Sequence, residues 1–275
     1  MEHGGGQIAA GLIRFERPDH GAVDLVTASA RTMRQVRGGE IAMIFQEPMT
    51  SLNPVFPVGD QIAEAIELHQ DKSAGASRAE ALRMLGQVRI PDARAVMARY
   101  PHQLSGGMRQ RVMIAMALAC DPRLLIADEP TTALDVTLQA QILDLMRELK
   151  AASGAAIILI THDLGVVAEV CDEVAVMYAG EIVERAPVDE LFANPQHPYT
   201  VGLLGSIPRL DRRASHLATI EGMVPNMANP PSGCRFAARC PFVRDICIAT
   251  PPPLTMLTPG HASRCIRAPL ERLVS

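Results

Sequence analysis

The sequence has few of the side chains that stack on nucleic-acid bases. Its 275 residues contain no Trp, three Tyr and six Phe, and the formal net charge is −4. Single strands are bound by aromatic platforms along a basic groove, and duplexes by concentrations of Lys and Arg. The composition therefore argues against nucleic acid as the main partner.

Long apolar runs are also missing. The longest runs, at 112–120 and 155–160, fall well short of the about 20 residues that span a bilayer. Residues 1–14 lack the basic segment that opens a signal peptide. We therefore expect a cytoplasmic protein that meets a membrane only through partners. Six cysteines in a reducing compartment then favour metal binding or free thiols over disulfides.

Hydrophobic periodicity, capping residues and breakers predict the main elements. The predicted strands lie at 11–15, 22–26, 40–45, 124–127 and 157–160, with a hairpin at 173–179 and 181–186. The predicted helices lie at 29–36, 58–69, 112–120 and 164–170, with another after residue 135. A capping box at Ser77–Glu80 predicts the start of one more helix, which ends before Pro91.

A polar, glycine-containing turn stands before the apolar helix at 112–120. It consists of Ser105, Gly106 and Gly107. Such a turn leaves backbone N–H groups free at the positive end of the helix dipole, which suits an anion such as a phosphate. An ordinary N-cap explains the same residues equally well.

Acidic and histidine side chains follow two of the predicted strands. The run 124–127 ends in Asp128 and Glu129, and the run 157–160 is followed by His162. Parallel strands bring their carboxyl ends to one edge of a sheet, where α/β folds bind ligands. One carboxylate there can hold Mg²⁺ while the other activates a water, and a histidine can bond a phosphate. Taken singly, each motif is also explained as a solvated strand end or a cap.

In this order and spacing, the motifs together resemble the ATPase subunits of ABC transporters. Residues 104–110 are similar to the family's signature motif, 124–129 to its Walker B segment, 133–135 to its D-loop, and His162 to its switch histidine. The resemblance implies an α/β fold of the P-loop NTPase type, an ABC ATPase core with a helical subdomain inserted at about 56–104.

The resemblance also implies a role for each site residue. Glu129 would orient the attacking water, and His162 would stabilise the transition state. Gln46 would contact Mg²⁺ and that water; it lies in a ten-residue match, 45–54, to the peptide-importer branch. Asp128 would hold Mg²⁺. The ATP contacts would come from Ser105, Gly106, Gly107, Gln110 and Asp135, which in this family act on the nucleotide of a second subunit.

One part of the family pattern has no counterpart in these residues. The P-loop, Gly-x-x-x-x-Gly-Lys-Ser/Thr, is absent: the glycines at 4–6 have no lysine, and Lys72 has no glycines before it. The core is therefore expected to be incomplete at the N-terminus, through a start assigned too late or a truncated gene product. We expect no ATP binding by the chain alone.

Beyond about residue 190 the composition changes and proline becomes frequent. Residues 194–200 resemble the opening of the C-terminal extension of oligopeptide/dipeptide importer ATPases, in which His197 is expected to be buried in a Pro-rich turn. The predicted domains are thus 1–190 and 191–275.

The extension contains four cysteines, Cys234, Cys240, Cys247 and Cys265. Four thiolates suffice for a zinc ion or an iron–sulfur cluster, although the gaps do not match the paired CxxC of ordinary zinc sites. The run 233–241 with the two later cysteines resembles the part of the family extension that carries a [4Fe–4S] cluster in some members. Zinc and free thiols remain the alternatives.

The resemblance implies an ATP-hydrolysing subunit that powers oligopeptide or dipeptide import from the cytoplasmic face of the inner membrane. Its cofactors would be ATP and Mg²⁺. Its partners would be a second ABC ATPase subunit, forming a heterodimer, two membrane-spanning permease subunits and an extracytoplasmic solute-binding protein. A vestigial or regulatory subunit that contributes only its signature motif is one alternative. A soluble ABC ATPase of DNA repair or translation is another, against which the extension argues. The transported solute, whether peptide, nickel or another, stays open.

Overall fold

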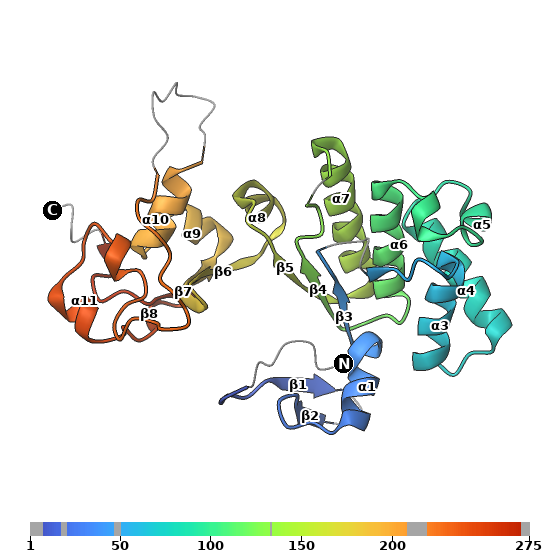
Figure 1. Cartoon of the computed structure of the whole chain (residues 1–275), viewed down its shortest axis with the longest axis horizontal. Coiled ribbons are helices and arrows are strands. Elements are labelled where there is room, and N and C mark those ends of the chain that lie inside the picture. The colour runs from blue at the N-terminus through green and yellow to red at the C-terminus, as the bar shows by residue number, and fades with distance from the viewer. Residues whose placement is uncertain (1–7, 18–20, 47–50, 133, 208–218, 271–275) are drawn as a thin grey trace. The chain divides into compact units, whose positions relative to one another are not determined.

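The structure is a computed structural model that describes residues 8–17, 21–46, 51–132, 134–207 and 219–270. The chain forms two compact units, Met1–Ile160 and Thr161–Ser275. Figure 1 shows the elements of both. The domain boundary predicted at 190/191 lies inside the second unit and stays a prediction. Among the described residues, no helix is both long enough and apolar enough to cross a membrane.

The first unit opens with a small hairpin and a helix. Strands β1 (Arg14–Arg17) and β2 (Gly21–Asp24) pair in antiparallel fashion. Helix α1 (Ala30–Gly39) follows, capped by Ser29, whose hydroxyl accepts a hydrogen bond from the backbone N–H of Thr32. The predicted elements at 11–15, 22–26 and 29–36 are therefore present with shifted ends, as is usual for boundaries set by local pattern alone.

A three-stranded parallel sheet lies at the centre of the first unit. Its order is β3 (Ile41–Ile44), β4 (Leu124–Asp128) and β5 (Ala156–Ile160). All three strands were predicted, and their parallel pairing confirms that their carboxyl ends meet at one edge. Helices α6 (Gly106–Leu118) and α7 (Val136–Ser153) lie beside the sheet in Figure 1 and supply residues to the same core.

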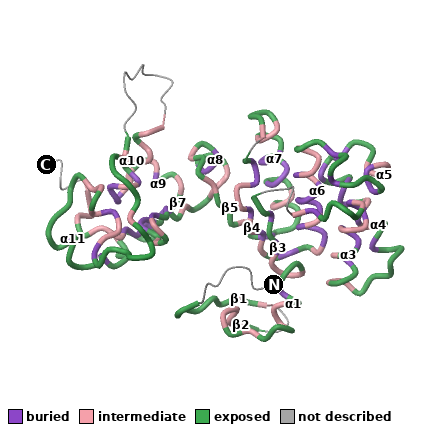
Figure 2. Tube along the Cα trace, in the orientation of Figure 1, coloured by how far each residue is buried: buried purple, intermediate pink, exposed green. Residues whose placement is uncertain are grey.

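Burial alternates along the strands of this sheet; Figure 2 colours each residue of the trace by its burial. Ile44 and Leu125 belong to the core and are almost inaccessible. Met43, Ile158 and Ile160 alternate with core-facing positions and are 38%, 49% and 46% exposed. Alternation of this kind follows from the two-residue period of a strand.

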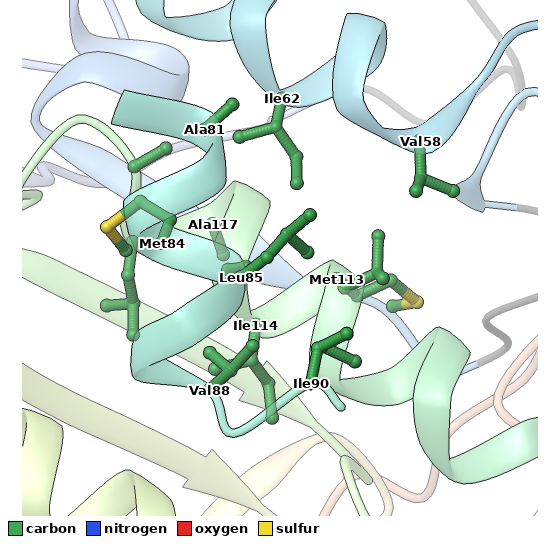
Figure 3. Close-up of a cluster of buried hydrophobic side chains, with 14 of the residues drawn as sticks. Val58, Ile62, Ala81, Met84, Leu85, Val88, Ile90, Met113, Ile114 and Ala117 are labelled. Atoms are coloured by element: carbon green, nitrogen blue, oxygen red, sulfur yellow. The ribbon is translucent and has the colours of Figure 1, made fainter. Parts of the chain in front are cut away.

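The predicted insert at 56–104 is helical. It contains α3 (Val58–His69), α4 (Ala74–Gln87), α5 (Ala93–Val96) and the 3₁₀ helix η1 (Pro101–Gln103). Figure 3 shows Ile62 of α3 and Leu85 of α4 packed with Ile114 of α6, and all three are fully buried. This apolar cluster holds the insert against the helix that follows the Ser-Gly-Gly turn.

The start of α4 differs from its prediction. Ser73 is the N-cap, and its Oγ accepts a hydrogen bond from the N–H of Ala76 at 3.4 Å. The capping box predicted at Ser77 is wrong, because Ser77 lies within the helix and is fully buried. Its hydroxyl has no hydrogen-bond partner among the described residues. A Ser followed by a Glu three residues later matched the pattern, but the helix had already begun.

The second unit is built on an antiparallel sheet of order β6-β7-β9-β8. The predicted hairpin is confirmed as β6 (Glu173–Tyr178) and β7 (Glu181–Pro187), whereas β8 (Thr255–Thr258) and β9 (His261–Ser263) were not predicted. The helices are α8 (Leu164–Val170), α9 (Val188–Ala193), α10 (Pro198–Gly205), η2 (Ala237–Arg239) and α11 (Asp245–Ala249). Phe236 and Tyr178 lie in the core of this unit, so the proline-rich segment is an integral part of its fold.

Candidate functional site

Glu129 stands at the carboxyl edge of the parallel sheet in an uncommon backbone conformation. It directly follows β4, its φ is +44°, and its N–H donates to the carbonyl of Ile160 at the end of β5. Non-glycine residues held in the left-handed region carry a conformational cost and are enriched at functional sites.

Two side chains hold the Glu129 carboxylate. Gln46 Nε2 and Thr132 Oγ1 each donate to Glu129 Oε2 at 2.8 Å. The structure thus brings together Gln46 and Glu129, which are 83 positions apart and were both predicted as site residues. Thr132 was missed by the sequence analysis. Its position three residues after Glu129, within a tight turn closed by the Thr132 N–H to Glu129 carbonyl bond, was the available signal.

Asp128 is the last residue of β4 and is half-buried. In the sheet register it stands opposite Ile160, the last residue of β5. A carboxylate at the end of a parallel strand has the chemistry that Mg²⁺ prefers. The role of Asp128 as a Mg²⁺ ligand stays a prediction.

The Ser-Gly-Gly turn begins helix α6 as predicted. Ser105 is the N-cap; its Oγ accepts a hydrogen bond from the N–H of Met108 at 3.3 Å, and its side chain is exposed. Gly106 is exposed too, and a Cβ added there would meet no atom within 4 Å. Both residues therefore lie where an anion from outside could reach the helix N-terminus.

Gly107 and Gln110 face inward. A Cβ on Gly107 would lie 2.5 Å from Leu138 Cδ2, so any larger side chain here would have to displace the Leu138 side chain of α7. Gln110 is 3% exposed, and its Nε2 has no hydrogen-bond partner among the described residues. The ATP contacts of Gly107 and Gln110 stay predictions.

Asp135 caps helix α7. Its carboxylate accepts a hydrogen bond from the N–H of Leu138 at 2.9 Å, and the residue is exposed. Of its predicted D-loop neighbours, Leu134 is described and Ala133 lies outside the described residues. A capping carboxylate is stabilised by the helix dipole, and its predicted contact with a nucleotide remains open.

His162 belongs to the second unit, two residues beyond the end of β5. Its side chain is exposed, and Asp163 next to it caps α8 through the N–H groups of Gly165 and Val166. This cap at Asp163 fixes the residue at which α8 begins. The switch role of His162 stays a prediction.

All four cysteines of the extension line one cavity in the second unit. The cavity measures about 20 Å³, and Cys234, Cys240, Cys247 and Cys265 share its wall with His197 and Phe236. The six cysteines of the chain are free thiols. Within the described ranges, no three His, Cys, Asp or Glu side chains are arranged to hold a metal ion. The fold thus brings four thiols that are far apart in the sequence to the wall of one cavity, but it does not place them at bonding distance from a single metal ion.

Burial and the backbone act oppositely on these thiols. Burial raises the pKa of Cys240 to about 11, which keeps the metal-free thiol protonated near neutral pH. Burial likewise raises the pKa of Cys265, while the backbone N–H groups of Arg267 and Ala268 oppose that rise. The N–H of Arg267 lies 3.4 Å from Cys265 Sγ. N–H groups aimed at sulfur stabilise a thiolate once it forms.

His197 is buried in the Pro-rich turn, as predicted, with 1% of its surface exposed. Its backbone N–H donates to Glu184 Oε2 at 2.9 Å, and its Nδ1 accepts a hydrogen bond from the N–H of Tyr199 at 3.1 Å. Burial lowers the pKa of His197 to about 4, so the ring is neutral near pH 7. The same Glu184, itself fully buried, accepts from the N–H of Gln196 and pairs with His261 Nε2 at 2.8 Å.

Two family models match the chain. The model described as ABC transporter covers residues 6–132, and the model described as oligopeptide/dipeptide transporter, C-terminal region, covers residues 183–247. The first match includes the Gln46–Glu129 pair and the Ser-Gly-Gly turn. The second match begins within β7 and includes His197 and three of the four cysteines of the cavity.

Two relatives have names that describe peptide transport. A protein of Brucella melitensis biotype 1, whose name describes it as a peptide import ATP-binding protein, is 55% identical over 268 residues, covering 95% of this chain and 79% of that protein. The dipeptide transport ATP-binding protein DppD of Bacillus subtilis is 54% identical over 242 residues, covering 88% and 72%.

Solved ATP-binding cassettes share the fold. The dimeric cassette MJ0796, in a post-hydrolysis state bound to ADP and Pi, matches with a TM-score of 0.54 and 26% identity over 60% of this chain and 70% of that one. The identity to the relatives, over most of both chains, is far above what fold similarity alone would require. The chain therefore belongs to the family of ABC transporter ATP-binding subunits that carry the oligopeptide/dipeptide transporter C-terminal region.

Proposed function

We propose that this chain is the ATP-hydrolysing subunit of an importer for oligopeptides or dipeptides. Subunits of its family are ATPases that use ATP and Mg²⁺ and work with membrane permeases. The observation that carries the proposal is the hydrogen bond between Gln46 and Glu129 at the carboxyl edge of the sheet. The names of the relatives describe peptide import and dipeptide transport, and they do not favour a purely regulatory subunit.

In this mechanism Glu129 orients the water that attacks the γ-phosphate. Its carboxylate is anchored at one oxygen by Gln46 and Thr132, so its direction is set before substrate arrives. Preorganised groups of this kind lower a barrier because little reorganisation remains at the moment of reaction. Asp128 would hold Mg²⁺, which draws charge from the phosphates. His162 would donate to the γ-phosphate in the transition state.

Other residues serve the nucleotide of a second ATPase subunit, which we expect to be a different chain. Ser105 and Gly106 are exposed at the N-terminus of α6, where free N–H groups bind phosphate. Asp135 is exposed at the start of α7. The complex would include two permease subunits and an extracytoplasmic solute-binding protein, with this subunit peripheral on the cytoplasmic side of the inner membrane.

The change Glu129→Gln tests the proposal in the importer assembled with its partner subunits, in a chain extended at its N-terminus by the P-loop segment that residues 1–275 do not contain. We expect ATP hydrolysis to fall on the order of 100- to 10,000-fold, because the water loses its general base. ATP binding, measured by titration calorimetry, should be unchanged, and peptide uptake into vesicles should stop. Glu148→Gln is the matched control, since Glu148 is an exposed residue of α7 paired only at the surface with Arg89. Hydrolysis near the unmutated rate in Glu129→Gln would show that another group activates the water.

A second part of the proposed function is an iron–sulfur cluster held by Cys234, Cys240, Cys247 and Cys265. Their shared cavity supports it. A single tetrahedral zinc needs its four sulfurs at about 2.3 Å from one point, and the described side chains offer no such grouping. A cluster instead distributes its thiolates over several iron atoms. When bound, it would cross-link the four segments and exchange an electron.

A further inference from the structure

His197 occupies a special place in the wall of the cysteine-lined cavity. Apart from the cysteines, the polar side chains of that wall in the described part of the chain are His197 and Arg267. Arg267 is partly open to solvent, whereas His197 is 1% exposed. A polar ring buried at the edge of a cavity is costly unless its hydrogen-bonding groups find partners.

One contact holds the backbone of His197, and two others fix the orientation of its ring. The backbone N–H is held by the buried carboxylate of Glu184 at 2.9 Å. Nδ1 accepts the N–H of Tyr199 at the start of α10 at 3.1 Å. The ring packs on Phe236, itself part of the cavity wall, with centroids 5.8 Å apart. The imidazole is therefore set in place by its surroundings before any group enters the cavity.

The contact at Nδ1 also assigns the tautomer. A nitrogen that accepts a backbone N–H carries no proton, so the proton of the neutral ring is on Nε2. Within the described residues, Nε2 makes no hydrogen bond. His197 therefore has one fixed acceptor side, turned to α10, and one donor side without a protein partner.

We propose that His197 donates its Nε2–H to a sulfur of the group held by the four cysteines, and thereby raises the reduction potential of that group. The inference rests on the iron–sulfur cluster proposed above. Reduction adds negative charge to a cluster and its sulfurs, so a hydrogen-bond donor stabilises the reduced form more than the oxidised form. Hydrogen bonds to sulfur are among the factors that set cluster potentials.

Two substitutions separate the donor role from the structural one. In His197→Asn, the short amide keeps an acceptor for the Tyr199 N–H, since Asn is a favoured N-cap, but has no donor at the position of Nε2. In His197→Gln, the longer amide offers a donor near that position and loses the cap. Cys240→Ser serves as the control that removes a ligand.

The full chain and its variants are purified without oxygen, incubated with iron and sulfide, and analysed for iron content, sulfide content and visible absorbance. Midpoint potentials then follow from redox titration monitored by electron paramagnetic resonance. We expect the unmutated chain to take up iron and sulfide and Cys240→Ser to lose the cluster. We expect His197→Asn to load normally with a more negative midpoint potential, and His197→Gln to lie near the unmutated value.

The outcomes distinguish the two proposals. If the unmutated chain takes up no iron and sulfide, the cluster itself is refuted, and the role of His197 with it. Suppose instead that the unmutated chain takes up iron and sulfide, but the midpoint potential of His197→Asn equals that of the unmutated chain, or only that of His197→Gln changes. The cluster is then supported, and His197 only caps α10. Should His197→Asn fail to fold, pulsed electron paramagnetic resonance of the reduced, ¹⁵N-histidine-labelled unmutated protein decides. A weak ¹⁵N coupling supports the inference, and a loaded cluster without one overturns it.

Discussion

Glu129 in the first unit and Glu184 in the second are both carboxylates that accept more than one hydrogen bond, yet their surroundings differ. Glu129 is held by two side chains, Gln46 and Thr132, at an accessible edge of the sheet. Glu184 is fully buried and is held by two backbone N–H groups and by His261, which is 1% exposed. Side-chain donors can move aside when a substrate arrives, whereas backbone donors cannot leave without unfolding.

The comparison teaches that a count of hydrogen bonds does not separate the carboxylate proposed to be catalytic from a structural one. The two histidines make the same point. His162 is exposed at a turn, and His197 is buried with its pKa lowered to about 4 by desolvation. Accessibility and the kind of donor decide which groups remain available for chemistry.

Replacing each glutamate by glutamine tests this comparison most strongly. We expect Glu184→Gln to cost about 3 to 5 kcal/mol of unfolding free energy, because the change leaves buried donors facing an amide N–H₂. Glu129→Gln should cost less than about 1 kcal/mol, since its amide oxygen still accepts near solvent. Urea unfolding followed by circular dichroism, which reports on the helices and strands of both units, measures the two losses. Equal losses from the two changes would contradict the distinction.

A smaller effect is expected from the thiols Cys120 and Cys240, one in each unit. Burial raises the pKa of each thiol from 9.0 to about 11. At a given pH below 9, a rise of this size leaves about 100-fold less thiolate. Both thiols of the metal-free protein should therefore be alkylated slowly by iodoacetamide at pH 8, relative to a cysteine peptide. Incubation with iron and sulfide should protect Cys240 completely and leave Cys120 unchanged, as peptide mass mapping would measure. If Cys240 were alkylated at the same rate after incubation with iron and sulfide, the expected difference between Cys240 and Cys120 would be absent.

The smallest effect separates Ser73 from Ser77 in helix α4 of the first unit. Ser73→Ala should cost about 1 kcal/mol, because it removes the cap for the N–H of Ala76. Ser77→Ala should cost nothing or stabilise slightly, because the buried hydroxyl has no partner in the described structure. Urea unfolding followed by circular dichroism measures both. A larger loss of unfolding free energy in Ser77→Ala than in Ser73→Ala would indicate that Ser77 caps the helix, as the sequence predicted.

Most elements with a clear period were predictable. Helices α3 and α8 have the bounds that were expected, and the core strands β3, β4 and β5 lie on the expected apolar runs. Strands β8 and β9 were missed because they are short, lie among prolines and depend on pairing with the distant β7. The family was also recognisable, because its motifs are short local patterns that survive in the sequence.

The sequence by itself predicted the candidate site residues, and it predicted that parallel strands would bring Asp128, Glu129 and His162 to one edge. Only the tertiary structure decided that Thr132 shares in holding Glu129, that Gln110 is buried, and that Gly107 lies against the Leu138 side chain. It alone gathered the four cysteines around one cavity beside His197. The physical reason is range: periodicity and capping act over a few residues, whereas burial and convergence depend on contacts between segments far apart in the chain.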